Sequence, residues 1–385
     1  MTARLAPPRP AECHGEAAAS SMLVVVPPAP GAVARAAADT LVLGVPLPRR
    51  IAMAAQRAGF GRAVVAAELN GPAAARSRIV LLPGNVLPQT AWLRELREMP
   101  VEPDTIYLDP TGAAVVETDE AARVLKAAAR GLSAPELLAE LRGSFSVRER
   151  PANPQGRFTI RGPSEVRAAE TWLLRSLIKD SEGFMSRHVE RRISLALTRR
   201  LVRTSVTPNM ITVVSVGIGL LGAPFFLSMT PLAQVAGAML FLAHSILDGC
   251  DGEVARLKFL ESRGGAILDF WGDNLVHQAI FSCMAIGWAL ASHSAWPLVL
   301  GALAVAATLG AAAIASQRFI SGRALIGADR ALARLVDAFS HRDFIYLILV
   351  LAAFGQAHRF IALAAAGTPL FLLLLLWVSS RQRTR

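Results

Sequence analysis

The chain has 385 residues, of which 53% are hydrophobic and only 18% are charged, a balance too apolar for an ordinary soluble protein. The formal net charge of +11 is concentrated, since residues 142–203 hold 14 Lys or Arg against 6 Asp or Glu. No basic motif interleaved with aromatic residues accompanies this charge, which argues against nucleic-acid binding. The composition predicts a membrane protein with a basic segment facing anionic lipid.

The first 21 residues are rich in Ala and Pro and contain no continuous apolar stretch. We expect a disordered tail over residues 1–21 and no signal peptide, so that the domain after it stays in the cytosol. The three cysteines form no pair at metal-ligand spacing, and no disulfide framework is predicted. They are Cys13, Cys250 and Cys283.

Residues 22–150 alternate short β-branched or apolar runs with helical stretches, which is typical of a soluble α/β domain. A Gly-Val-Pro-Leu segment at 44–47 leads a helix, and an Ala-Gly-Phe segment at 58–60 leads a strand. This order of elements resembles the sugar or polyol phosphate nucleotidyltransferases. The expected strands lie at 22–26, 63–68, 79–82, 105–108 and 114–117.

Two positions depart from that resemblance. Such enzymes carry a glycine-rich loop after the first strand, whose backbone N–H groups cradle phosphates. Here residues 27–31 read Pro-Pro-Ala-Pro-Gly, and proline has no N–H to donate. Asn85 stands where the resemblance places a metal-binding aspartate. The sequence therefore predicts a degenerate nucleotidyltransferase-like domain without cytidylyltransferase activity.

Residues 151–205 are expected to link this domain to the membrane part. Prolines and glycines at 151–163 predict a loop, and a helix is expected at about 164–180. The apolar run at 193–197, followed by Arg199 and Arg200, predicts an amphipathic helix along the membrane surface. That helix either guides an amphiphilic substrate or only anchors the chain.

Residues 206–385 contain six apolar stretches with the length of transmembrane helices, the first being uncharged over 211–229. Arg and Lys gather in alternate connections, so the positive-inside rule places both termini and the second-to-third connection in the cytoplasm. The sequence thus predicts an α-helical membrane protein with six transmembrane helices, preceded by a soluble α/β domain. The predicted spans are 211–229, 232–253, 266–292, 296–316, 341–357 and 360–378.

Four aspartates surround the second-to-third connection. Asp248 and Asp251 are three residues apart, and Asp269 and Asp273 are four apart, so each pair shares one helix face. Charges this close to apolar helices are costly and usually functional, although any one of them could be a solvated helix cap. If the faces meet, the carboxylates repel, and a hard divalent cation with oxygen ligands is the usual remedy. The pattern predicts a metal site.

Small residues accompany the aspartates. Gly252 and Ala255 fall on or beside the face of Asp248, and Gly265 lies one turn before Asp269. Small side chains leave room for a bulky ligand, such as a nucleotide, to approach the backbone.

Other polar residues nearby leave two interpretations open. His244 and His277 lie one turn outside the aspartates, and we expect packing or hydrogen-bonding roles, with the border of a cavity as the alternative. A long loop carries three arginines that suit either a phosphate-bearing acceptor or anchoring at the interface. These are Arg323, Arg330 and Arg334.

Residues 248–273 match every fixed position of the pattern D-x-x-D-G-x-x-A-R followed by G-x-x-x-D-x-x-x-D. This pattern resembles the signature of the CDP-alcohol phosphatidyltransferase family, and the Thr-Pro-Asn at 207–209 is similar to the family's start of the first helix. The resemblance covers about residues 205–385. The matching residues are Asp248, Asp251, Gly252, Ala255, Arg256, Gly265, Asp269 and Asp273.

The resemblance implies a membrane enzyme, usually dimeric, that moves a phosphoalcohol group from a CDP-linked donor to a hydroxyl acceptor and releases CMP. It implies that Asp248, Asp251 and Asp269 bind Mg²⁺ or Mn²⁺ together with the donor pyrophosphate. Asp273 is predicted to belong to the metal site as the fourth aspartate and to serve as the base for the acceptor hydroxyl. The implied nucleotide site consists of Gly252, Ala255, Arg256 and Gly265.

Some proteins in this resemblance fuse a cytidylyltransferase to the membrane enzyme, namely bifunctional inositol-phosphate cytidylyltransferase and di-inositol-phosphate phosphate synthase proteins. The donor is open between CDP-diacylglycerol and a CDP-polyol. A cation transporter using the aspartates is an alternative, but the chain shows no internal repeat or paired broken helices. A non-catalytic scaffold is disfavoured because all four aspartates are present.

Overall fold

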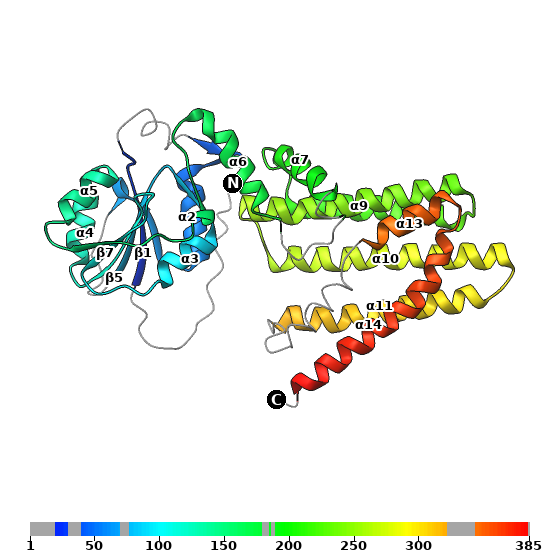
Figure 1. The fold of residues 1–385 in the computed structure, drawn as a ribbon. Coiled ribbons are helices and arrows are strands. Elements are labelled where there is room, and N and C mark those ends of the chain that lie inside the picture. Colours follow the sequence, from blue (N-terminus) through cyan, green and yellow to red (C-terminus); the bar gives the residue numbers. More distant parts are fainter. Residues whose placement is uncertain are drawn as a thin grey trace, which may run out of the picture. The chain divides into compact units, whose positions relative to one another are not determined.

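The structure is a computed structural model that describes residues 20–29, 40–69, 77–178, 185, 189–321 and 343–383. The chain divides into two compact units, Met1–Trp172 and Leu173–Arg385, whose elements are drawn in Figure 1. Most of the predicted tail over residues 1–21 lies outside the described residues. Each unit is taken by itself below.

The N-terminal unit is built on a six-stranded mixed sheet with the order β4-β1-β5-β8-β7-β9. Strand β1 pairs in parallel with β4 and β5, β8 runs antiparallel to β5 and β7, and β9 is parallel to β7. The predicted α/β character is confirmed, and each predicted strand has a counterpart. The strands are β1 Ser20–Val26, β4 Arg62–Val65, β5 Ser77–Pro83, β7 Thr105–Leu108, β8 Ala114–Thr118 and β9 Ser146–Glu149.

Helices cover both faces of the sheet, because the strands are apolar on both sides. Along β1, Met22, Val24 and Val26 belong to a buried cluster with α4 and α5, whereas Leu23 and Val25 point to the other face. Figure 1 shows α2 and α3 on that second face. The helices are α2 Leu47–Ala58, α3 Thr90–Glu98, α4 Ala121–Ala128 and α5 Ala134–Leu141.

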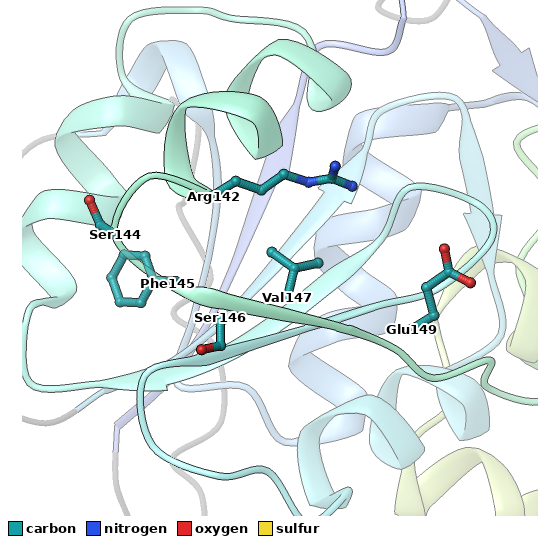
Figure 2. Close-up of a pocket in the computed structure, with 6 residues that line it drawn as sticks. All are labelled: Arg142, Ser144, Phe145, Ser146, Val147 and Glu149. Carbon is teal, nitrogen blue, oxygen red and sulfur yellow. The ribbon is translucent and has the colours of Figure 1, made fainter.

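Strand β9 forms one edge of the sheet among the described strands. Beside it lies a surface hollow of about 620 Å³, whose lining side chains Figure 2 shows. Arg148 and Glu149 on this edge disfavour pairing with another strand. The hollow is formed by the single stretch 142–149 and lies in a different unit from the predicted aspartate site.

The segments after β1 and β5, where a nucleotidyltransferase would hold its ligand, make backbone contacts instead. The Pro27 carbonyl accepts a hydrogen bond from Ala134 N at 2.8 Å, and Gly84 N donates to Val26 O at 2.9 Å. The Asn85 side chain donates to Ile160 O at 3.1 Å, and Ile160 N returns a bond to Asn85 O at 2.9 Å. Asn85, which stands where the nucleotidyltransferases have a metal-binding aspartate, thus holds the segment around Ile160 in place.

The structure differs from the predicted linker over residues 151–205, because the first part of this segment is built into the N-terminal unit. Strand β10, Arg157–Thr159, pairs with β6, Val86–Pro88, and helix α6 extends over Val166–Arg175. In α6, the buried Glu170 accepts a bond from Leu43 N at 3.0 Å.

Glu170 also acts on a buried cation of α2. Burial lowers the pKa of Arg50 to about 10, and the negative charge of Glu170 opposes that shift. Arg50 donates to Val42 O at 3.0 Å as well. A buried charge is costly without an opposite charge nearby, so this contact holds α6 on the N-terminal unit. The short strands β2 Leu41–Val42 and β3 Val45–Pro46 precede α2.

The C-terminal unit is entirely helical in the described residues. Five of its helical segments are long and apolar enough to cross a membrane, so the chain has the features of a multi-pass membrane protein. Its elements are α7 Arg191–Leu201, α8 Pro208–Gly222 continued by η5 Ala223–Leu227, α9 Pro231–Lys258, α10 Arg263–Ser292, α11 Trp296–Ser321, α13 Phe344–Ala353, η6 Ala357–Arg359 and α14 Phe360–Arg383.

The predicted fifth span, 341–357, corresponds in the described part of the chain to α13. This helix has 10 residues, fewer than the roughly 20 that cross a bilayer core, and the chain immediately before it is outside the described residues. The prediction of six transmembrane helices therefore stays a prediction. Helix α13 packs against α9 and its Ile345 and Ile348 are buried.

From the contacts after β1 and β5, we predict that the N-terminal unit is catalytically silent. The full-length protein, given CTP, Mg²⁺ and a panel of polyol phosphates, should release no pyrophosphate above background, because Asn85 and the prolines supply neither a metal-binding carboxylate nor a phosphate-binding loop. Asn85→Asp should not restore release, since the prolines after β1 still supply no phosphate-binding loop. Release of pyrophosphate by the unaltered chain would show that this unit is an active cytidylyltransferase.

Candidate active site

Helix α8 brings the two aspartate-bearing helices together. It starts where Thr207 accepts a hydrogen bond from Met210 N, with Pro208 in the first turn, and it packs against both α9 and α10. A Cβ placed on Gly219 would lie 2.5 Å from Val276 of α10 and 3.1 Å from His244 of α9. Only a glycine lets α8 approach both helices this closely.

The carboxylates of three predicted residues converge, as the helix faces suggested. Asp248 and Asp251 project from α9 and Asp269 from α10, and one oxygen of each lies within 4.8 Å of the others. Asp248 is 6% exposed and Asp251 is 4% exposed. Like charges that are close together and poorly hydrated repel strongly, so this arrangement favours a bound cation.

The donor set fits a hard divalent cation, which binds carboxylate oxygens. One oxygen, Oδ1 of Asp269, is buried and has no hydrogen-bond partner in the described part of the chain. Asp251 is oriented from outside the cluster by Thr212 of α8, whose hydroxyl donates to Asp251 Oδ2. A metal ion bound here would be coordinated by carboxylate oxygens of the cluster.

Asp273 lies close enough for its charge to act on Asp251 and Asp269, but it is not one of the three carboxylates that converge. The cluster of carboxylates within 4.8 Å does not include it in the described structure. Its Oδ1 lies 3.4 Å from Nε2 of His244, which is 1% exposed. This contact is an ion pair only if His244 is protonated, so the predicted packing or hydrogen-bonding role of His244 stays a prediction. His277 packs edge-on against Phe241, with ring centroids 5.5 Å apart.

The residues predicted to hold a nucleotide lie near the C-terminal end of α9 and the N-terminal end of α10. The guanidinium of Arg256 lies over Gly252, where a Cβ would be only 3.2 Å from Arg256 Nη1. Gly265 N donates to Ser262 Oγ at 3.0 Å, and a Cβ on Gly265 would be 3.0 Å from Asn209 Oδ1. Ala255 is half-buried on α9. Larger side chains at the two glycines would fill this space.

Several residues at the site were not predicted. Thr212 supports Asp251, and Glu253 on α9 is fully buried and bound by Arg191 and Ser194 of α7. A charged residue such as Glu253 within the largely apolar helix α9 indicates that it has a buried polar partner. The spacing of residues in the sequence could not identify that partner, because α7 lies about 60 residues earlier in the chain. The arginines predicted for the long loop, Arg323, Arg330 and Arg334, lie outside the described residues.

Comparison with known proteins agrees with the sequence pattern. Residues 205–379 match the CDP-alcohol phosphatidyltransferase family, so the C-terminal part of the chain contains a CDP-alcohol phosphatidyltransferase domain. The matched region includes all four aspartates. An interpretation as a cation transporter is not favoured by this match.

Curated relatives match parts of the chain. The bifunctional IPC transferase and DIPP synthase of Thermococcus kodakarensis is 35% identical over 160 residues, which cover 41% of this chain and 34% of the relative. The protein of the same name from Rubrobacter xylanophilus is 35% identical over 44% of this chain and 38% of its own. The chain thus spans little more than a third of the length of these relatives. The resemblance to such bifunctional proteins is confirmed.

Two further comparisons concern a mycobacterial enzyme. The phosphatidylinositol phosphate synthase of Mycobacterium tuberculosis is 31% identical over 121 residues, covering 31% of this chain and 54% of the relative. A crystal structure of this synthase with CDP-DAG bound is similar, with a TM-score of 0.35 and 22% identity, over 48% of this chain and 94% of that chain.

We predict that the carboxylate cluster binds a divalent cation and that Asp248→Ala weakens this binding. The detergent-solubilised protein can be titrated with Mn²⁺ and followed by electron paramagnetic resonance. Loss of a residue that only supports a metal ligand typically raises the dissociation constant roughly 10- to 100-fold, and loss of the ligand Asp248 should raise it by more. Glu261→Ala is the matched control, because it removes one exposed carboxylate between α9 and α10 and should leave the constant unchanged. Equal Mn²⁺ binding by wild type and Asp248→Ala would exclude the cluster as the metal site.

Proposed function

Because residues 205–379 form a CDP-alcohol phosphatidyltransferase domain, we propose that the chain transfers a phosphoalcohol group from a CDP-linked donor to a hydroxyl acceptor and releases CMP. The observation that carries this proposal is the convergence of Asp248, Asp251 and Asp269 from two helices. Each belongs to the sequence pattern that the family match covers. The donor and acceptor are the partners that this reaction requires.

The three converging carboxylates would hold Mg²⁺ or Mn²⁺ against the donor pyrophosphate. Such an ion neutralises phosphate charge and makes CMP a better leaving group. The residues themselves supply the fixed geometry, since Thr212 orients Asp251 and the surrounding helices bury Asp248. Oxygen ligands do not distinguish between the two ions, and both are expected to support the reaction.

Asp273 would act as the general base. The acceptor oxygen attacks the phosphorus atom that carries the alcohol, the bond from that phosphorus to the CMP oxygen breaks, and the hydroxyl proton passes to the Asp273 carboxylate. Asp273 is not one of the three carboxylates that converge within 4.8 Å, which supports this assignment, because a base must keep a lone pair for the proton. His244 Nε2 lies 3.4 Å from Asp273 Oδ1 and would orient this carboxylate.

The nucleotide of the donor would occupy the space around Gly252, Ala255, Arg256 and Gly265. The two glycines leave room that a side chain would fill, and Arg256 is a cation beside them. A guanidinium suits phosphate, because it donates in a planar fork. This arrangement supports Arg256 as the residue that neutralises the donor phosphates.

We propose a cytoplasmic site in a six-helix membrane domain that forms a homodimer. The basic connections predict the orientation by the positive-inside rule, and an acceptor and a CDP-linked donor would reach the site from the cytosol. Relatives named phosphatidylinositol phosphate synthase and bifunctional IPC transferase and DIPP synthase support a polyol or polyol phosphate as one substrate. The donor is either CDP-diacylglycerol or a CDP-polyol.

CMP release provides the direct test of this function. Membranes containing the protein should release CMP from at least one CDP-linked donor when a matching hydroxyl acceptor is added, and chelation of divalent metal should stop the release. CDP-diacylglycerol with inositol phosphate, and CDP-inositol with the same acceptor, separate the lipid from the polyol donor. Membranes containing Asp248→Ala control for other enzymes. Absence of metal-dependent release across the panel would contradict the proposed function.

A second prediction separates Asp273 from the metal site. Asp273→Asn keeps the shape of the side chain and removes the base, so turnover should fall by a factor of about 10² to 10⁴, the usual contribution of a positioned base. Binding of Mn²⁺ and of the CDP-linked donor should stay near wild type in calorimetric titration. If donor or metal binding fell in proportion to the rate, Asp273 would instead be a metal ligand.

A further inference from the structure

Helix α7 is joined to α9 by polar contacts and by a small apolar cluster, in which Leu197 and Leu201 pack against Cys250 and Val254. Its buried residues are Ser194 and Thr198, whereas Ile193 is 49% exposed. The Cys250 thiol of α9 lies 3.6 Å from Ser194 O. Figure 1 shows α7 lying beside α9.

The strongest contact between the two helices is a buried ion pair. Glu253 of α9 is fully buried, and its Oε1 accepts from both Arg191 Nη1 and Ser194 Oγ, the latter at 2.8 Å. Its other oxygen, Oε2, is buried and has no hydrogen-bond partner in the structure as described. Among the described residues, the cation that binds the Glu253 carboxylate directly is Arg191 of α7.

Arg256 is the other cation within reach of Glu253. The two residues are three apart on α9, so they are neighbours on the helix surface. The charge of Glu253 acts on Arg256, but no hydrogen bond or ion pair joins Arg256 to any residue that the structure describes. Its guanidinium lies over Gly252 instead, one residue from Asp251.

We propose that Arg191 is a positioning residue that neutralises Glu253 and thereby keeps Arg256 available for the phosphates of the donor. This inference rests on the proposed function, since it assigns a donor to Arg256. In the poorly hydrated surroundings of α9, a carboxylate without a cation is strongly unfavourable. Without Arg191, the nearest remedy for Glu253 is Arg256, which would then turn away from the donor.

This arrangement gives α7 a role in donor affinity. The helix was expected either to guide a substrate or to anchor the chain, and the ion pair adds a third effect. By compensating Glu253, α7 determines which way the guanidinium of Arg256 points. The effect falls on binding of the donor rather than on proton transfer, because Arg256 is assigned to the donor phosphates and Asp273 to the proton of the acceptor hydroxyl.

The test is a double-mutant cycle between Arg191 and Glu253. Arg191→Met should raise the donor KM and the donor Kd about 10- to 100-fold, the range expected when a hydrogen bond to a charged group is lost, while kcat changes less than threefold. Arg191→Met with Glu253→Gln should recover most of the donor affinity, because no charge then competes for Arg256. Arg192→Met, one residue along and exposed, is the matched control and should resemble wild type.

Unfolding temperatures in detergent distinguish positioning from support of the fold. Arg191→Met should unfold at a lower temperature, and the double variant should recover stability and affinity together. Glu253→Gln alone should keep donor affinity within about twofold, and this variant provides the test if Arg191→Met does not fold. Unchanged donor affinity in Arg191→Met, or no recovery in the double variant, would overturn the positioning role. An unaltered protein that neither binds donor nor releases CMP would instead overturn the proposed function.

Discussion

The repulsion among buried carboxylates is the constraint on which the helical unit depends. Asp248, Asp251 and Asp269 approach within 4.8 Å, and Glu253 lies two residues further along α9 in a fully buried position. Each negative charge needs a compensating group, since water is largely excluded. The cluster is suited to a cation from solution, whereas Glu253 receives a cation from the chain itself. Helix α9 therefore carries two acidic sites, one suited to a metal ion from solution and one neutralised by an arginine of the chain.

Small residues make this arrangement possible. Gly219 and Gly272 let α8 approach its neighbours, and a Cβ on Gly272 would lie 2.6 Å from Val216. Helices in a bilayer associate through close packing and polar contacts rather than through the hydrophobic effect. The same glycines that bring the backbones together thus fix the spacing of the side chains that carry charge. Larger residues at these positions would move α8 away from the carboxylate cluster.

The sequence predicted the part of the site that depends on spacing within one helix. The three- and four-residue intervals among the aspartates define shared faces, and the structure brings three of the four carboxylates together. Contacts between distant segments could not be predicted in this way. Thr212 with Asp251, and Arg191 with Glu253, depend on how helices cross, and no periodicity encodes that crossing. Five strands of the main sheet were also predicted, but β9 was not. The pairing of β10 with β6 was not predicted either, since a three-residue strand among prolines resembles a loop.

The docking of α6 on the N-terminal unit has a consequence for how that unit can be isolated. Glu170 contacts Leu43 N and offsets the buried charge of Arg50, although more than a hundred residues separate it from either. A soluble fragment ending near residue 150 would lose both β10 and α6, and it would expose Arg50, Leu43 and the edge of β6 to water. Such a fragment would tend to aggregate because of the missing segment, whatever the stability of the sheet itself. The N-terminal unit extends to Trp172, so a fragment that keeps these contacts has to include β10 and the part of α6 that carries Glu170.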